Sequence, residues 1–416
     1  MIHSLQEITH LVTDGKHGDC QNEEESGYYF ISCKDVKDGW VDYSGARQIT
    51  KEDFLDTHRR TQLQHDDILV TNSGTIGRMA LVKNNPETKR TTFQKSVAII
   101  KPDQGKVLPK WLYYSLLGNK NALIAWAGGT AQKNLLLRDM RAFKIDVPPL
   151  STQLKITSIL SAYDDLIENN TRRIEILEEM ARMIYQEWFV KFSFPGHKKV
   201  KMVDSKLGKI PEGWMIKKLQ DICELVMGQS PKSEFYNEKG NGLPFHQGVT
   251  NFGLRFPTDK TYCTVENRIA EAGDILFSVR APVGRINLAD KKIVIGRGLC
   301  AIRSKNGNQS FIFHQLKEKF IVEDSIGGGT IFKAVTKKDM QDIDLINPIE
   351  TLISNFEDVI EPIFHQLANL TYKNETLRQT RDLLLPRLIS GEIDVEEIDI
   401  ETGPPTGELD HAGISA

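Results

Sequence analysis

The sequence predicts an α+β protein built by internal duplication, with two mixed α/β domains separated by two long antiparallel helices that pair as a coiled coil. Two observations carry this prediction. Residues 154–189 contain neither proline nor glycine and place apolar residues at alternating steps of four and three, the heptad pattern of a paired helix. The same pattern returns 200 positions later in the same register, and a globular-looking block precedes each copy.

Each predicted helix carries a seam of mostly apolar residues. The first seam is Tyr163, Ile167, Asn170, Ile174, Leu177, Ala181, Ile184 and Trp188, and the second is Ile363, Leu367, Leu370, Asn374, Leu377, Arg381, Leu384 and Leu388. An antiparallel pairing that puts Asn170 opposite Asn374 places each seam residue of one helix opposite a seam residue of the other. Residue 163 is then opposite residue 381, and residue 177 is opposite residue 367. We expect the two asparagines to hydrogen-bond and to fix the register, as buried asparagines do in coiled coils.

The two blocks before the helices share landmarks but little else. Asp67-Ile68-Leu69 matches Asp274-Ile275-Leu276, and Gly77-Arg78 matches Gly284-Arg285. The offset between the copies shrinks from 214 to 200 along the chain, so the copies differ by loop insertions. The residues between the landmarks differ almost completely. The pattern therefore indicates one scaffold, present twice, whose two copies recognise two different targets.

The chain divides into six predicted segments. These are a first domain (1–150), a central helix (151–193), a linker (194–214), a second domain (215–348), a distal helix (349–391) and an acidic tail (392–416) that we expect to be disordered. Pro386 should end or kink the distal helix, because proline costs a helix interior about 3 kcal/mol.

Composition narrows the class of protein. A chain of 416 residues exceeds one ordinary core. We expect a cytoplasmic protein without a membrane segment, because no apolar run approaches a membrane helix and no signal peptide is recognisable. Five cysteines without CxxC spacing suggest reduced thiols rather than a zinc site. The last 25 residues hold eight acidic and no Lys or Arg residues, and their removal changes the net charge from −3 to +5. A mildly basic body is compatible with nucleic acid.

No catalytic or metal-binding motif is recognisable: the sequence has no phosphate loop, dinucleotide fingerprint or HExxH. Recurring glycines and cations are the candidates for DNA contacts. The glycine loops would be either plain turns or places where backbone amides and a lysine approach a phosphate; the arginines would form internal salt bridges or bind phosphate or guanine. The candidates are Arg78, Lys95, Gly128, Gly129, Thr130 and Lys133 in the first copy, and Arg285, Arg297, Gly328, Gly329, Thr330 and Lys333 in the second.

Four stretches resemble the conserved regions of type I restriction–modification specificity subunits. They are PLSTQ (149–153) running into ILSAYD (159–164), EWFVKF (187–192), LGKIPEGW (207–214) and LLPRLISGEI (384–393). The resemblance covers residues 1–400. The second copy departs from it at Ile349 and Ile353, which stand where the first has Pro149 and Gln153.

The resemblance implies two target recognition domains, each binding one half of a split, asymmetric sequence in double-stranded DNA. It also implies helices that act as a spacer and dock two modification (methyltransferase) subunits, with restriction (motor/nuclease) subunits completing the enzyme. Methyl donor, ATP and magnesium would then belong to those partners, and this chain would be non-catalytic. A helix of ~35 residues spans about 50 Å, enough to separate successive major grooves about 34 Å apart. The alternatives are a stand-alone DNA-modifying enzyme and a coiled-coil scaffold.

Overall fold

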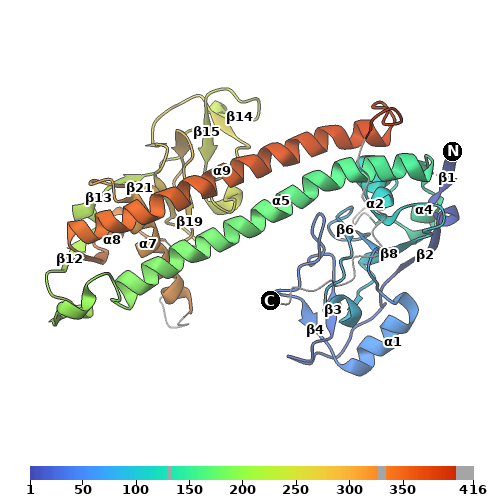
Figure 1. Cartoon of the computed structure of the whole chain (residues 1–416). Helices are drawn as coiled ribbons and strands as arrows, with labels where there is room; N and C mark the ends of the chain where they lie inside the picture. Colours follow the sequence, from blue (N-terminus) through green and yellow to red (C-terminus); the bar gives the residue numbers. More distant parts are fainter. Residues whose placement is uncertain (129–133, 326–333, 400–416) are drawn as a thin grey trace. The chain divides into compact units, whose positions relative to one another are not determined.

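The computed structural model describes residues 1–128, 134–325 and 334–399, and it divides into two compact units (Figure 1). Unit 1 contains Met1–Ile167 and the chain from Thr376 onward, and unit 2 contains Glu168–Glu375. The boundary falls inside both long helices, α5 (Leu150–Tyr185) and α9 (Glu350–Ile389). Each unit therefore holds one mixed α/β domain together with a segment of α5 and a segment of α9.

The two domains share the order of their central strands but differ in the segments between them: a helix over Lys51–Thr61 in the first has no counterpart among the described residues of the second. The first contains β1 (Ile2–Ser4), η1 (Leu5–Glu7), β2 (Thr9–Asp14), β3 (Tyr29–Ile31), β4 (Arg47–Gln48), α1 (Lys51–Thr61), β5 (Ile68–Thr71), β6 (Met79–Leu81), η2 (Thr88–Arg90), β7 (Thr91–Phe93), β8 (Val97–Pro102), α2 (Pro109–Gly118), α3 (Lys120–Ala125), α4 (Leu137–Ala142) and β9 (Lys144–Asp146). The second contains β12 (Met215–Lys218), α6 (Leu219–Ile222), β13 (Cys223–Met227), η5 (Ser233–Phe235), β14 (Tyr236–Asn237), β15 (Leu243–His246), η6 (Val249–Asn251), β16 (Tyr262–Cys263), β17 (Ile269–Ala270), β18 (Ile275–Ser278), β19 (Ile286–Leu288), β20 (Ile293–Ile295), β21 (Leu299–Ser304), α7 (Gln309–Ser325), α8 (Lys337–Gln341) and β22 (Asp344–Asn347).

A four-stranded antiparallel sheet forms the centre of each domain, ordered β2-β8-β5-β6 in the first and β13-β21-β18-β19 in the second. All four residues of β5 are buried. Ile68 and Val70 belong to one apolar cluster and Leu69 to another, because successive side chains of a strand point to opposite faces. Both faces of the sheet are thus covered, which explains why the strand reads as a continuous apolar run.

Antiparallel pairing of the helices is visible inside each unit. In unit 2, Ile174 of α5 shares a buried cluster with Leu367 and Leu370 of α9. The predicted hydrogen bond is present, with Asn170 Nδ2 donating to Asn374 Oδ1 at 3.0 Å, and every seam residue is at least partly buried. In unit 1, the Arg381 guanidinium pairs with Asp164, the residue next to Tyr163, at 2.5 Å.

Proline and the C-terminal segment differ from expectation. Helix α9 runs unbroken through Pro362 and Pro386 to Ile389, so the prediction of an end at Pro386 is wrong. The tail is not disordered at residues 392–399. Val395 is buried in the unit 1 core and Ile393 packs against it, because unit 1 offers an apolar surface at the end of α9. Residues 400–416 lie outside the described part of the chain.

The segment expected to be a plain linker contains regular structure. After α5 the chain makes a π-helical turn, η3 (Gln186–Val190), and then a short 3₁₀ turn, η4 (His197–Lys199). A hairpin of β10 (Met202–Ser205) and β11 (Gly208–Pro211) follows. After the hairpin comes Trp214, which is buried among Phe189, Phe192 and Phe194. These aromatic contacts anchor the segment to the foot of α5.

The start of each long helix is held differently. Gln153 is fully buried; its amide donates to the carbonyls of Lys106 and Pro148 and accepts from the backbone of Leu108. Its counterpart Ile353 is buried in an apolar core instead. The sequence difference between Gln153 and Ile353 therefore replaces a hydrogen-bonded helix start with a packed one.

Candidate nucleic-acid interface

One end of the four-stranded sheet is built on the same plan in the two domains. We call it the strand-end edge, formed by residues 15–16, 72–78 and 94–96 in the first domain and by 228–229, 279–285 and 296–298 in the second. Gly15 donates its backbone N–H to Val97 O, and Gly228 donates to Leu299 O. A Cβ atom on Gly15 would lie 1.9 Å from Phe93 O, and one on Gly228 would lie 2.1 Å from Gly296 O. Only glycine allows this close approach, so the edge is held tightly in both copies.

Two exposed cations occupy equivalent positions on this edge. Lys95 lies in the β7–β8 turn and Arg297 lies in the β20–β21 turn, each two residues before the central strand. The neighbouring loop binds each turn: Lys95 N–H donates to Lys16 O, and Arg297 N–H donates to Ser230 Oγ. Both side chains project from a backbone that the glycine contact fixes. Both residues are predicted candidates for DNA contacts, and the strand register now shows that their positions are equivalent.

The loops that follow β5 and β18 close in the same way. Thr71 Oγ1 accepts from the N–H of Arg78, and Ser278 Oγ accepts from the N–H of Arg285 at 2.8 Å. Gly77 and Gly284 both have φ near +85°, a conformation that side-chain-bearing residues rarely adopt. Among the described residues, the Arg78 guanidinium makes no hydrogen bond or ion pair, and it is half-buried. Arg285 is exposed.

The predicted glycine loops fall mostly outside the described residues. Gly129, Thr130, Lys133, Gly328, Gly329, Thr330 and Lys333 are not described. Gly128 exchanges backbone hydrogen bonds with Asn134, which pairs with Ser73 of the strand-end edge. Ala334 pairs in the same way with Arg280. The glycine loop therefore starts or ends at the strand-end edge in both domains.

The opposite end of the same strands carries carboxylates. Asp67 precedes β5 and receives the ammonium of Lys101 at 2.6 Å, and Asp274 precedes β18 and binds the Arg303 guanidinium through two hydrogen bonds. Burial raises the pKa of Asp67, although Lys101 opposes the shift. These four residues are internal pairs. Asp66 and Asp103 lie at the same end and line a cavity of about 330 Å³ with His10 and His65. Because the cations at this end are paired with carboxylates, whereas Lys95 and Arg297 form no ion pair with a described residue, the strand-end edge is the better candidate for DNA.

Three further polar residues of unit 2 escaped sequence analysis. Gln229, Gln247 and Arg280 are exposed on the second strand-end edge. Gln247 Oε1 accepts a hydrogen bond from Ser230 Oγ at 2.7 Å, and the amide nitrogen of Gln247 takes no part in this contact. The paired strands place Ser32 and Ser73 at the positions of Gln247 and Arg280 in the first domain. Alignment of the two copies strand by strand would have found them.

Two other cations of the first domain, Arg60 and Lys16, have partners within the domain. The Arg60 guanidinium donates to the backbone carbonyls of Asp14 and Gly15, next to the close glycine contact. Lys16 binds Asp53 at 2.9 Å, and that hydrogen bond raises its pKa. Both cations therefore bind partners within their own domain, whereas Lys95 and Arg297 form no ion pair with a described residue.

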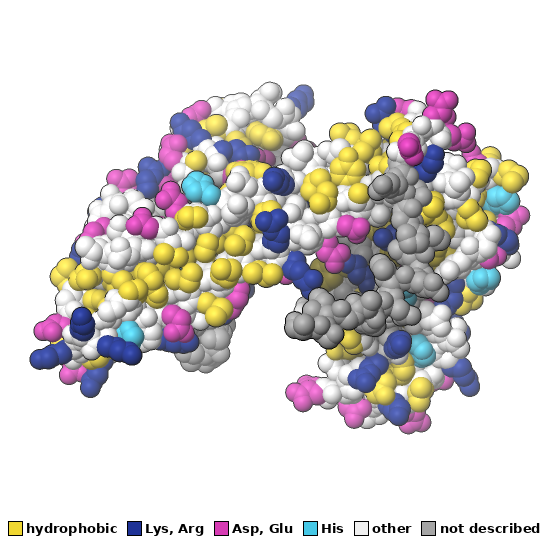
Figure 2. Space-filling view, viewed as in Figure 1, with side chains coloured by type: hydrophobic (Ala, Val, Ile, Leu, Met, Phe, Trp, Pro, Cys, Tyr) yellow, Lys and Arg dark blue, Asp and Glu magenta, His cyan; other side chains and the backbone are white. Residues whose placement is uncertain are grey.

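The helix segments of unit 2 expose apolar side chains. Ile176, Met180 and Met183 of α5 are each about half exposed, at 54%, 46% and 53%. On the face seen in Figure 2, hydrophobic side chains gather over these helices. The positions 200 residues later are Thr376, Thr380 and Leu383, so the corresponding part of α9 is more polar. An exposed apolar stripe of this kind is typical of a surface that a partner covers.

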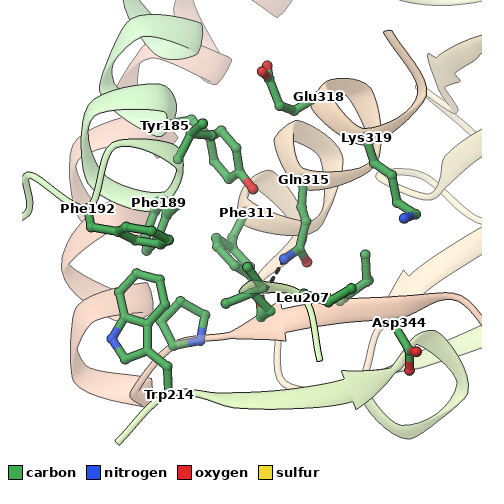
Figure 3. Close-up of a pocket in the computed structure, with 14 residues that line it drawn as sticks. Tyr185, Phe189, Phe192, Leu207, Trp214, Phe311, Gln315, Glu318, Lys319 and Asp344 are labelled. Atoms are coloured by element: carbon green, nitrogen blue, oxygen red, sulfur yellow. Dashed lines mark hydrogen bonds between the residues drawn. The ribbon is translucent and has the colours of Figure 1, made fainter. Parts of the chain in front are cut away.

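An apolar cavity of about 240 Å³ lies at the foot of α5 in unit 2 (Figure 3). The rings of Tyr185, Phe189, Phe311 and Trp214 line it, and Gln315 donates its amide to Ile346 O at 2.6 Å. Burial raises the pKa of Tyr185 far above its ordinary value, so its hydroxyl stays protonated. Glu318, Lys319 and Asp344 also line the cavity, beside its aromatic rings.

Metal and membrane chemistry find no support in the part of the chain that the structure describes. There, no group of three or more His, Cys, Asp or Glu side chains is arranged to hold a metal ion. No described helix is both long enough and apolar enough to cross a bilayer. All five cysteines are free thiols, and burial raises the pKa of Cys223 and Cys300 to about 12.

Comparison with known proteins points to one family. The model of the type I restriction modification DNA specificity domain matches twice, over residues 4–179 and 211–379. A type I restriction enzyme MjaX specificity subunit from Methanocaldococcus jannaschii is 31% identical over 84% of this chain and 83% of that protein. The MjaIX specificity subunit from the same organism is 28% identical over 85% and 83%. The crystal structure of a type I restriction–modification S subunit from M. genitalium has the same fold, with a TM-score of 0.56 and 17% identity over 93% of this chain and 95% of that chain.

Proposed function

Because the chain belongs to the family of type I restriction–modification specificity subunits, we propose that its two domains bind the two halves of a split DNA sequence. The observation that carries the proposal is the strand-end edge, which occurs twice with the same backbone and with different exposed side chains. The turns carry Lys95 and Arg297, and the second edge adds Gln247 and Arg280. One scaffold with two sets of polar side chains suits recognition of two unlike half-sites.

Charge supports the orientation of each domain toward DNA. Exposed or unpaired cations lie at the strand-end edge, whereas carboxylates lie at the other end of the same strands. Phosphate contacts would position each domain, and side chains on the loops would contact base edges in the major groove. The helix pair would set the distance between the half-sites.

Partner subunits would supply the chemistry. The exposed apolar residues of α5, among them Ile176 and Met180, would dock modification subunits, and restriction subunits would join that complex. Methyl donor, ATP and magnesium would bind to those partners. The chain itself would then act as the DNA-binding component of a methyltransferase and endonuclease.

The test is a genome-wide map of methylated bases in cells that express this chain with its modification subunit. We expect a two-part motif with a fixed gap that disappears when this chain is omitted. A continuous palindrome, or a motif that persists without the chain, would contradict the proposal. Purified chain alone should neither cleave nor methylate DNA; activity would favour a stand-alone enzyme. Absence of sequence-dependent DNA binding by the assembled complex would favour a protein scaffold.

A further inference from the structure

The β7–β8 turn and the β20–β21 turn are the same structural position in the two domains. Parallel pairing aligns Ile31 with Phe93 in the first domain and His246 with Ile295 in the second. From those pairs, the chain reaches Lys95 and Arg297 after the same number of residues. The two cations are therefore equivalent, although the surrounding sequences differ.

The backbone of each turn has little freedom. Gly15 packs against the first turn and Gly228 against the second, each so closely that a Cβ atom would not fit. In the second turn, Gly298 also donates its N–H to Gln247 O. Ser96 O also accepts from the N–H of Asn72, which joins the turn to the loop after β5. The Cα–Cβ bond of a residue in the middle of such a turn therefore has a fixed direction, which limits the places that its side chain can reach.

The side chains at this position share one chemistry. Lys95 and Arg297 are both exposed, and no other described residue forms an ion pair with either. By contrast, Lys101 and Arg303, six residues further along the same strands, are both paired with a buried carboxylate. Lysine and arginine are also the residues that bind the O6 and N7 acceptors of guanine.

We propose, on the basis of the function proposed above, that Lys95 and Arg297 each contact a guanine in the major groove and are specificity-determining residues of the two half-sites. Arg297 would bind O6 and N7 with two hydrogen bonds, and Gln247 and Arg280 flank it on the same edge. In the first domain the flanking positions are Ser32 and Ser73, so Lys95 is the longest donor of these three residues. Each half-site would thus contain one G·C pair that depends on its own turn.

The test compares methylation motifs of Arg297→Ala, Arg297→Lys and Lys95→Ala, each in complex with the modification subunit. Arg297→Ala should relax one G·C pair of one half-site, by on the order of tenfold to a hundredfold in discrimination, and leave the other half unchanged. Arg297→Lys should keep the preference for that pair, because lysine also binds O6 and N7 of guanine. Lys95→Ala should relax one G·C pair in the opposite half. The two sites thereby control for each other, because loss of folding would erase a whole half-site. Lys305→Ala, at the far end of β21, removes one charge of the same domain and should leave the motif intact.

Three results would overturn the inference. Evenly weakened binding and a lower salt dependence in Arg297→Ala, without relaxation at any base pair, would make Arg297 a phosphate contact. An unchanged motif in Arg297→Ala and Lys95→Ala would remove both residues from recognition. Relaxation at an A·T pair would exclude guanine. If the unsubstituted chain gives no two-part motif, the proposed function itself fails, which is a distinct result.

Discussion

The junction between domain and helices is built from different chemistry in the two units. In unit 1, Asp164 of α5 accepts hydrogen bonds from Tyr114 of α2 and from Arg381 of α9, both at 2.5 Å. In unit 2 the equivalent positions are Phe364, His314 and Ala181. There the Arg255 guanidinium, from the loop after η6, lies 4.1 Å from the Phe364 ring, and His314 meets the same ring edge-on.

Each junction places a guanidinium against the position of residue 164 or 364. Burial and the Asp164 carboxylate raise the pKa of Tyr114, and hydrogen bonds with Asp164 and Asp382 raise that of Arg381 despite burial. In unit 2, burial lowers the pKa of Arg255 to about 10, opposed by Glu178 at 3.8 Å. At packed positions, therefore, the two copies can have side chains of different chemistry. Positions that backbone geometry dictates, such as Gly15 and Gly228, stay the same.

The largest effect should come from that shared backbone position. Gly228→Ala puts a Cβ against Gly296 O and should destabilise unit 2 by about 3 kcal/mol or more. Gly15→Ala should do the same to unit 1. Chemical denaturation of the full chain measures both. Gly248→Ala and Gly45→Ala are the matched controls, because a Cβ on either meets no atom within 4 Å. Equal stability of Gly228→Ala and Gly248→Ala would show that the close approach is not required.

The asparagine layer should give the next largest effect. Asn374→Ala leaves the buried Asn170 amide without its partner and should cost about 1–3 kcal/mol in the free energy of unfolding. The double change to leucine should recover stability but weaken the preference for one helix register. A double-mutant cycle measures the coupling between the two residues. Additive single effects would mean that the hydrogen bond contributes nothing.

Acid should destabilise unit 2 through His314. Burial, with Lys317 and Arg255 nearby, lowers the pKa of His314 from 6.5 to about 3. Between these values the unfolded chain binds a proton that the folded chain does not, so stability falls by about 1.4 kcal/mol per pH unit below 6.5. His314→Phe should remove this slope, measured as urea midpoints from pH 7 to pH 5. An unchanged slope would assign the pH dependence to other groups. The equivalent residue of unit 1 is Tyr114, whose hydroxyl stays neutral over this pH range.

The smallest effect should come from the junction cation of unit 2. Among the described residues the Arg255 Nε has no hydrogen-bond partner, and its ion pair with Glu178 is long. Arg255→Met should therefore change the free energy of unfolding by less than about 1 kcal/mol, because methionine keeps the contact with Phe364. Arg381→Met, which leaves Asp164 with one partner, should cost more. Thermal denaturation of the two variants compares them, and the reverse order would contradict this reading of the junctions.

Repeats and periodicity made much of the fold predictable. The heptad seam located both helices and their asparagine layer, because burial on one face imposes a spacing that sequence shows directly. The shared glycines and Asp67/Asp274 marked the duplicated sheet. The passage of α9 through Pro362 and Pro386 was not predictable, since tertiary packing there outweighs local propensity. The burial of Val395 also depends on the core of the first domain, nearly 300 residues earlier.

The candidate interface was predictable only in part. Lys95 and Arg297 were recognisable as cations, but their equivalence required the strand register of Ile31 and His246, which sequence alone did not supply. Gln247 and Arg280 were missed because they lie in loops whose residues differ between the copies. Loops that contact a target differ in sequence when the targets differ, whereas the strands that position these loops keep their hydrophobic pattern.

The most direct test of the central claim, that one duplicated scaffold reads two half-sites held apart by its helices, is to lengthen both helices together. One heptad inserted after Ile174 in α5 and one before Leu370 in α9 keeps the seam in register. At 1.5 Å per residue it adds about 10 Å, or about three base pairs. Methylation mapping should return the same two half-sites with a gap longer by that amount. An unchanged gap, or altered half-sites with the original gap, would contradict the claim.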